Sequence, residues 1–273
     1  MLKIENLNFS YSRKTPLIDN FSMTLEKGSV CGLLGKNGAG KTTLIYLICG
    51  LLRPKYGTID FNGLTPFERK TSFLNDIFLV PEEFSLPPVT LEEYVSVNAP
   101  FYPNFDKTQI EKYLEIFELT PDLHLGRLSM GQKKKAFISF AMACNTSLLI
   151  LDEPTNGLDI SAKRSFRKAI AQCMSDDKSI LISTHQVYDV DKILDHVIIT
   201  DRKGVLINAP MVDISSRYKF SFTTDKSRAE AALISLEVPG GYNIAEPLSD
   251  PMEETEVNLE TLFELVQQNR IFK

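Results

Sequence analysis

The sequence predicts an α/β protein built on a parallel sheet, with an antiparallel β region before it, a helical region within it and a small α/β tail after it. Three apolar runs without alternation indicate strands buried on both faces, and a helical pattern follows each of them. The three units are residues 30–34 with a helix over about 41–51, residues 148–151 with a helix from about 160, and residues 180–183 with a helix from about 186.

Antiparallel strands are predicted at both ends of this core. Residues 2–9 hint at an opening strand, and residues 21–25 alternate between apolar and polar side chains before a Lys-Gly turn. Residues 198–200 and 205–207 flank an Asp-Arg-Lys-Gly turn and predict a hairpin. We expect this hairpin to end the core domain, residues 1–210.

Two further regions complete the predicted architecture. Apolar residues at helical spacing predict a helical subdomain over about residues 82–147, with proline clusters between its helices. Residues 211–273 predict a C-terminal extension. Its expected elements are a strand at 218–222, a helix at 227–236, a strand at 242–244 and a last amphipathic helix at about 259–265.

Composition limits the possible partners. The chain has 273 residues, of which 43% are hydrophobic, so it can bury a sizeable core. Its 30 basic and 35 acidic residues give a net charge of -5, and the acidic excess falls within residues 211–273. No overall basic field would hold the chain to nucleic acid, so we expect no nucleic-acid partner and only local capture of phosphate.

Cysteine usage and hydropathy indicate a cytoplasmic protein without its own membrane anchor. The start of the chain is unlike a secretory signal, and no apolar run approaches the roughly 20 residues that a membrane span needs. If the protein works at a membrane, another subunit provides the span. The four cysteines stand alone in apolar contexts and are interpreted as reduced core residues: Cys31, Cys49, Cys144 and Cys173.

A glycine-rich loop lies between the first buried strand and its helix. It fits the G-x-x-x-x-G-K-[ST] pattern of a phosphate-binding P-loop, so its backbone N–H groups and the helix N-terminus would bind ATP phosphates. Lys41 would reach the β and γ phosphates, and Thr42 would hold Mg²⁺. A structural glycine turn is the alternative, which the flanking strand and helix disfavour. The expected nucleotide-binding residues are Gly35, Lys36, Asn37, Gly38, Ala39, Gly40, Lys41, Thr42 and Thr43.

A second strand ends in two acidic residues, Asp152 and Glu153. Carboxylates at the carboxyl edge of a parallel sheet lie where α/β proteins bind ligands. Asp152 suits the metal shell, and Glu153 suits a general base that polarises the attacking water. A helix cap in the following turn is an equally good explanation of this pair when it is taken alone.

Other motifs follow in the order found in the ATPases of ABC transporters, which the chain resembles over about residues 1–210. Leu128–Gln132 looks like the family's L-S-G-G-Q signature, and it also fits a capping box at a helix start. The resemblance implies that Ser129, Gly131 and Gln132 meet the γ-phosphate held by a second protomer. It also implies a RecA-like P-loop NTPase core.

The resemblance assigns further residues. Gly157-Leu158-Asp159 matches the D-loop, and His185 at a strand end matches the switch histidine that contacts the γ-phosphate. Tyr11 holds the place of the aromatic residue that stacks on adenine, although a surface or core tyrosine is nearly as good an explanation. With Lys41 and Glu153, His185 completes the expected catalytic set.

Two residues depart from the family pattern. Met130 replaces the first signature glycine, and Glu82 stands where the family usually has the Q-loop glutamine. We expect Glu82, with Thr42 and Asp152, to bind Mg²⁺ or its water. Its carboxylate adds negative charge beside ATP.

Softer similarities indicate the ABC-2 type exporter branch of the antibiotic-resistance kind. They are the Phe-Tyr-Pro-Asn-Phe-Asp insert at 101–106, the lysine run at 133–135 and the tail segment 258–263. The lysine run alone is more typical of a solvated helix face. The resemblance implies an ATPase that dimerises on ATP, with itself or a second ATPase subunit, and drives a transmembrane permease at the inner face of the cell membrane. The alternative is a soluble ABC ATPase of DNA repair, translation or iron–sulfur assembly.

Overall fold

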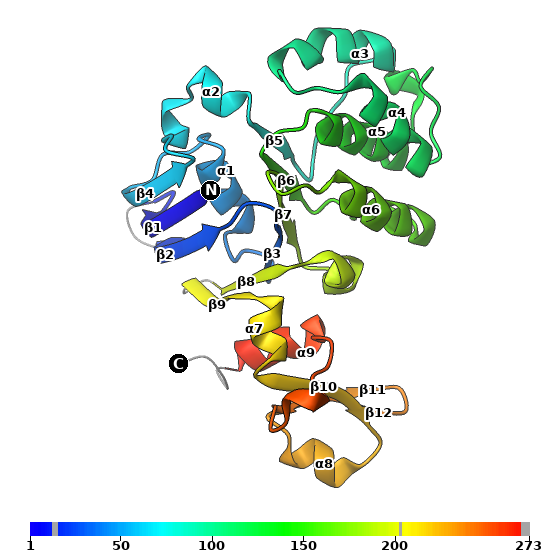
Figure 1. The fold of residues 1–273 in the computed structure, drawn as a ribbon. Helices are drawn as coiled ribbons and strands as arrows, with labels where there is room; N and C mark the ends of the chain where they lie inside the picture. The colour runs from blue at the N-terminus through cyan, green and yellow to red at the C-terminus, as the bar shows by residue number, and fades with distance from the viewer. Residues whose placement is uncertain (13–15, 202–203, 269–273) are drawn as a thin grey trace.

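A computed structural model describes residues 1–12, 16–201 and 204–268. Its centre is a six-stranded sheet in the order β5-β6-β7-β3-β8-β9, parallel except for β9, which pairs antiparallel with β8 (Figure 1). The strands of this sheet are β3 (Val30–Gly35), β5 (Ile77–Val80), β6 (Leu148–Asp152), β7 (Ser179–Thr184), β8 (His196–Asp201) and β9 (Gly204–Pro210). The predicted parallel core is therefore confirmed, and β5 is an additional strand.

The antiparallel region is a separate three-stranded sheet in the order β2-β1-β4, against the face of the core that also carries the helix α1 (Figure 1). Its strands are β1 (Leu2–Phe9), β2 (Ile18–Leu25) and β4 (Tyr56–Phe61), and α1 spans Lys41–Ile48. α1 ends earlier than predicted because Gly50 adopts φ 65°, where an added Cβ would lie 2.2 Å from the Pro66 carbonyl oxygen.

Helices cover the opposite face of the core sheet (Figure 1). The helical region contains α3 (Leu91–Asn98), α4 (Lys107–Ile116) and α5 (Met130–Ala143), preceded by the short α2 (Thr71–Leu74), while α6 (Ile160–Cys173) packs beside α4. Alternate strand residues point to the two faces, so two apolar clusters form. Leu148 and Ile150 of β6 belong to the cluster with α1, and Leu149 and Leu151 belong to the cluster with the helices.

The C-terminal extension begins with α7 (Met211–Ser215) and forms a three-stranded antiparallel sheet in the order β10-β12-β11. The other elements are β10 (Tyr218–Thr223), α8 (Lys226–Ala231), β11 (Ile234–Val238), β12 (Gly241–Pro247) and α9 (Leu259–Gln267). The helix predicted over 227–236 is therefore wrong in its second half, because Ile234–Val238 pairs with β12 along one edge of the sheet. Tertiary pairing overrides the helical pattern there.

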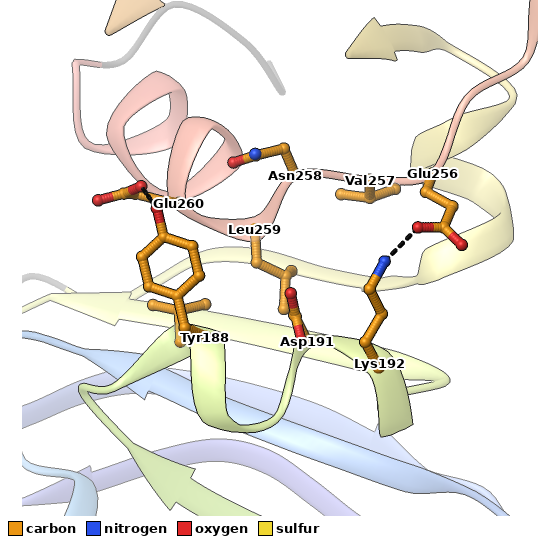
Figure 2. Close-up of a pocket in the computed structure, with 9 residues that line it drawn as sticks. Tyr188, Asp191, Lys192, Glu256, Val257, Asn258, Leu259 and Glu260 are labelled. Atoms are coloured by element: carbon orange, nitrogen blue, oxygen red, sulfur yellow. Dashed lines mark hydrogen bonds and ion pairs between the residues drawn. The ribbon is translucent and has the colours of Figure 1, made fainter. Parts of the chain in front are cut away.

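The extension is attached to the core at the segment that follows β7. Figure 2 shows the Tyr188 hydroxyl directed at the Glu260 carboxylate and the Lys192 ammonium paired with Glu256, around a small pocket. Leu262 and Leu265 of α9 belong to the same apolar cluster as the core helices. The extension thus shares a hydrophobic cluster with the helices that cover the central sheet.

The helix predicted from Gln186 is wrong. The chain forms two short 3₁₀ turns there, Val187–Asp189 and Asp191–Ile193. Asp189 is buried, its carboxylate pairs with Lys163 at 2.8 Å, and its carbonyl oxygen accepts a hydrogen bond from Arg167. These contacts with α6 hold the segment in two short 3₁₀ turns instead of an α-helix.

Two predictions about the whole chain can be compared with the described residues. All four cysteines are buried, and none of them forms a disulfide bond. Within residues 1–12, 16–201 and 204–268, no helix is both long and apolar enough to cross a membrane. The middle of the predicted hairpin turn, residues 202–203, lies outside the described part of the chain.

Candidate functional site

The motif residues gather at the carboxyl edge of the central sheet. The P-loop follows β3, Asp152 ends β6, His185 follows β7 and Glu82 follows β5. Because β5, β6, β7 and β3 are neighbours in the sheet, these four loops meet at one edge. This is the edge at which open α/β sheets bind their ligands.

Glycines shape the loop between β3 and α1. Gly38 and Gly40 adopt φ values of 78° and 94°, which disfavour residues with a side chain. At Gly35 a Cβ would lie 2.8 Å from the Thr200 carbonyl oxygen, so the backbone packs directly on β8. The loop turns tightly and leads into the start of α1, the arrangement in which backbone N–H groups bind phosphate.

Lys41 and Tyr11 flank this loop. The buried Lys41 ammonium donates to the Gly35 carbonyl oxygen at 2.8 Å, so it lies folded across the loop. Burial lowers the pKa of Lys41, and nearby carboxylates, led by that of Glu153, oppose the effect. The Tyr11 hydroxyl lies 3.2 Å from the Thr43 hydroxyl, and 68% of Tyr11 is exposed, which leaves its ring accessible beside the loop.

Asp152 combines burial with an unused oxygen. Its Oδ2 accepts a hydrogen bond from the Thr42 hydroxyl at 2.9 Å. Its Oδ1 is buried without a hydrogen-bond partner among the described residues. Burial raises the pKa of Asp152, and the hydroxyl groups of Ser183 and Thr42 oppose the rise. A buried acceptor without a partner is costly, which suits a site that receives a cation.

Glu153 is fixed from every side. It has a left-handed backbone, φ 46°, and its N–H donates to the Ser183 carbonyl oxygen at 2.8 Å. Its carboxylate accepts hydrogen bonds from the Thr184 hydroxyl at 3.0 Å and from the His185 N–H and Nδ1 at 3.1 and 2.8 Å. Lys41 Nζ lies 3.9 Å from Glu153 Oε1. These hydrogen bonds therefore hold Glu153 in its strained backbone conformation, as is common where strain serves a function.

The signature segment forms the start of α5. Ser129 is the N-cap, and a capping box joins it to Gln132, with the Ser129 Oγ 3.3 Å from the Gln132 N and the Gln132 Oε1 3.0 Å from the Ser129 N. Met130 is 61% exposed, so its side chain fills no space in the chain's own core. A Cβ on Gly131 would lie 3.5 Å from the Gly157 carbonyl oxygen, which places the D-loop beside the signature.

Asp159 and Glu82 make specific contacts of their own. Asp159 is the N-cap of α6 and accepts a hydrogen bond from the Ala162 N–H at 2.8 Å. Glu82 is exposed, and its Oε1 accepts a hydrogen bond from the Asn156 amide at 2.8 Å. The Glu82 charge also raises the pKa values of Lys41 and Asp152, although it is not the leading influence on either. Its carboxylate therefore acts on the site from its rim.

The sequence interpretation missed three residues at this edge. Lys134 is buried, so the interpretation of the lysine run as a solvated helix face is wrong for this residue. The Lys134 ammonium donates hydrogen bonds to the carbonyl oxygens of Glu153 and Asn156. The Asn156 side chain also accepts a hydrogen bond from Gln186 at 2.6 Å. These residues lie next to recognised motifs, which is the only signal that marks them in the sequence.

Known proteins resemble this chain in sequence and in fold. A family model described as ABC transporter matches residues 18–156. The chain is 30% identical to the bacitracin transport ATP-binding protein BcrA of Bacillus licheniformis, over 81% of this chain and 73% of that protein. It is 31% identical to the zinc uptake system ATP-binding protein ZurA of Listeria innocua, over 74% of this chain and 83% of that protein.

A solved structure described as the ATP-binding subunit of an ABC transporter superposes with a TM-score of 0.69 at 26% identity, covering 78% of this chain and 91% of that one. The chain belongs to the ABC transporter family. It is an ATP-binding subunit of an ABC transporter and an ATPase with a P-loop NTPase fold. The soluble ABC ATPases considered as an alternative are not favoured, because the matched relatives are subunits of transport systems.

Proposed function

We propose that this sheet edge hydrolyses Mg-ATP with Glu153 as the general base, and that the chain thereby powers a separate transmembrane permease. The observation that carries the proposal is the Glu153 carboxylate. It is buried, fixed by Thr184 and His185, and placed 3.9 Å from the P-loop lysine. A positioned carboxylate beside a phosphate site can orient and deprotonate water.

The P-loop residues Gly35–Thr43 bind the ATP phosphates in this proposal. Lys41 exchanges its contact with the Gly35 carbonyl oxygen for the β and γ phosphates, whose charge compensates the burial of its ammonium. The exposed Tyr11 ring stacks on adenine, since its hydroxyl already lies at the start of α1. His185 contacts the γ-phosphate through the ring edge that Glu153 does not occupy.

The donors at this edge fit Mg²⁺. Asp152 offers a buried, unpartnered carboxylate oxygen, and Thr42 offers a hydroxyl oxygen beside it. Oxygen donors of this kind suit a hard divalent cation that keeps several water ligands. Asp152 and Thr42 would hold the ion, and Glu82 would bind one of its waters. When bound, Mg²⁺ supplies charge neutralisation at the transferring phosphate.

The second half of each site comes from a partner ATPase subunit, either a second copy or a related chain. The side chains of Ser129 and Gln132 bond to each other, and no described hydrogen bond joins them to the P-loop of their own chain. The exposed start of α5 is thus available to the γ-phosphate on the partner. Gly131 and the D-loop residue Asp159 lie in the same surface region and would face the partner too.

The permease that this motor drives is an exporter of the ABC-2 type, with the ATPase on the cytoplasmic face of the membrane. This rests on the insert at 101–106 and the tail segment 258–263, which resemble that branch. The match to BcrA, named for bacitracin transport, is consistent with it.

ATP-dependent assembly tests the composite site. Glu153→Gln preserves shape and removes the base, so bound ATP should persist and the variant should elute as a dimer with Mg-ATP and as a monomer without it. Adding Ser129→Arg should abolish the dimer and leave ATP binding to the monomer intact, because the P-loop is untouched. A double variant that still dimerises on ATP would show that the signature does not face the partner's nucleotide.

A further inference from the structure

Lys134 is a buried cation that no motif explains. It lies in the second turn of α5 and is only 6% exposed, whereas the neighbouring Lys133 is partly exposed. Burying an ammonium group is costly unless hydrogen bonds and charges compensate. Its Nζ lies 2.9 Å from the Asn156 carbonyl oxygen and 3.2 Å from that of Glu153, and it donates to both.

These two carbonyl groups lie at the two ends of one turn. The Asn156 N–H donates back to the Glu153 carbonyl oxygen at 3.2 Å, which closes the turn from 153 to 156. Glu153 is strained at φ 46°, and a non-glycine residue in such a conformation costs on the order of 1–3 kcal/mol. Lys134 therefore ties both ends of the turn that carries the proposed base to the helix of the signature segment.

The same turn connects two further loops. The Asn156 side-chain amide donates to Glu82 at 2.8 Å, and its oxygen accepts a hydrogen bond from Gln186 at 2.6 Å. Gln186 follows the proposed switch residue His185 directly. An ammonium group behind Asn156 thus stabilises a bridge between the loop after β5 and the loop after β7, with the base between them.

Charge favours a cation at this point. Burial lowers the pKa of Lys134, and the carboxylates of Glu82, Glu153 and Asp152 oppose this shift. A hydrophobic side chain of the same length would leave the three acids with one buried cation, Lys41, among the described residues of the site. Both the two hydrogen bonds and the neighbouring carboxylates therefore favour a lysine at position 134.

We propose that Lys134 is a positioning residue for ATP hydrolysis, which holds the Glu153–Asn156 turn so that the Glu153 carboxylate meets the attacking water. The proposal rests on the proposed role of Glu153 as the base. Lys134 touches neither nucleotide nor water in this scheme and acts through the turn. Its loss should lower kcat and leave ATP binding to the P-loop nearly unchanged.

The test uses the full chain with Lys134→Met, Lys134→Gln and the matched control Lys133→Met. We expect kcat for ATP to fall at least about tenfold in Lys134→Met and less in Lys134→Gln, which keeps one donor. The Kd for ATP should stay within about twofold in both, because the P-loop is unchanged. Lys133→Met should match the parent chain. Thermal unfolding shows whether each variant folds. If Lys134→Met does not fold, kcat and Kd of Lys134→Gln are compared with those of the parent chain.

The deciding arm repeats the Lys134 substitutions in a Glu153→Gln background. If Lys134 acts through Glu153, the double variants should hydrolyse ATP no more slowly than Glu153→Gln, since residues that act as a unit are not additive. Parent-level kcat in both Lys134 variants, or an equal further loss in the Glu153→Gln background, would overturn the inference. A Glu153→Gln variant with parent-level turnover would instead overturn the proposed function.

Discussion

The carboxyl edge of the central sheet and the C-terminal extension place their charged groups in opposite environments. At the edge, the side chains of Lys41 and Glu153 are 8% and 7% exposed. Where the extension meets the core, Lys192 and Glu256 form an ion pair with side chains 63% and 83% exposed. Exposed pairs contribute little to stability, typically about 0–1 kcal/mol, whereas buried charges interact strongly and are costly to keep. The edge keeps its charged groups buried, as the proposed hydrolysis requires, and the extension pairs Lys192 and Glu256 at the surface.

The two regions also shift carboxyl pKa values in opposite directions. Burial raises the pKa of Asp152 above its ordinary value of 3.8. In the extension, the hydrogen bond from Arg228 lowers the pKa of Glu246 below its ordinary value of 4.5. Folding therefore works against the ionised form of Asp152 and favours the ionised form of Glu246.

The largest expected effect comes from Lys41→Ala. Lys41 is the buried cation of the P-loop, so its loss should weaken ATP binding and abolish turnover. Nucleotide titration and phosphate release measure the two effects. Turnover at the parent rate would show that the loop is not the phosphate site.

A smaller change is expected for Glu82→Gln. Glu82 lies at the rim and bonds to Asn156, whose amide can also donate to a glutamine side-chain oxygen. The variant should keep appreciable hydrolysis and change the dependence of the rate on Mg²⁺ concentration. A loss as complete as that of a Glu153 variant would mean that Glu82, and not Glu153, acts as the base.

The smallest effects, in stability, should have opposite signs in the two regions. Without Mg²⁺ at neutral pH, Asp152→Asn should raise Tm, because it removes the cost of a buried carboxylate; about 1 kcal/mol corresponds to 2–4 °C. Glu246→Gln should lower the free energy of unfolding by about 1 kcal/mol, because it removes the ion pair with Arg228, in which the side chains of Arg228 and Glu246 are 40% and 25% exposed.

The pH dependence checks the signs of these two effects. A raised pKa such as that of Asp152 contributes stability at low pH that is lost as pH rises through the folded value, so the advantage of Asp152→Asn should vanish in acid. A lowered pKa such as that of Glu246 contributes stability that is lost as pH falls, so the deficit of Glu246→Gln should vanish there too. Equal signs at neutral pH would contradict the comparison.

The sequence predicted which residues meet at the carboxyl edge of the central sheet better than it predicted the surrounding structure. The P-loop, Asp152 and His185 each lie at the carboxyl end of a buried parallel strand, and neighbouring strand ends lie close in space whatever their separation in the chain. Local pattern was enough to place these residues together. The extent of the domains and the roles of the site residues remain predictions.

What the sequence did not predict depends on long-range contacts. The chain after Gln186 has a helical pattern, but its contacts with α6 bend it into 3₁₀ turns. Ile234–Val238 is part of a predicted helix and pairs as a strand. Lys134 is one of three consecutive lysines, and only the position of the turn after β6 distinguishes it from Lys133. Tertiary contacts decided each of these cases, and no local spacing encodes them.

The role of Glu153 as the base is tested by the rate at which Glu153→Gln hydrolyses ATP. Turnover should fall about 10²–10⁴-fold, as is typical when a general base is lost. The Kd for ATP should stay close to that of the parent chain, because the P-loop and Lys41 are intact. Hydrolysis by Glu153→Gln at the parent rate, with ATP bound equally well, would show that Glu153 is not the base.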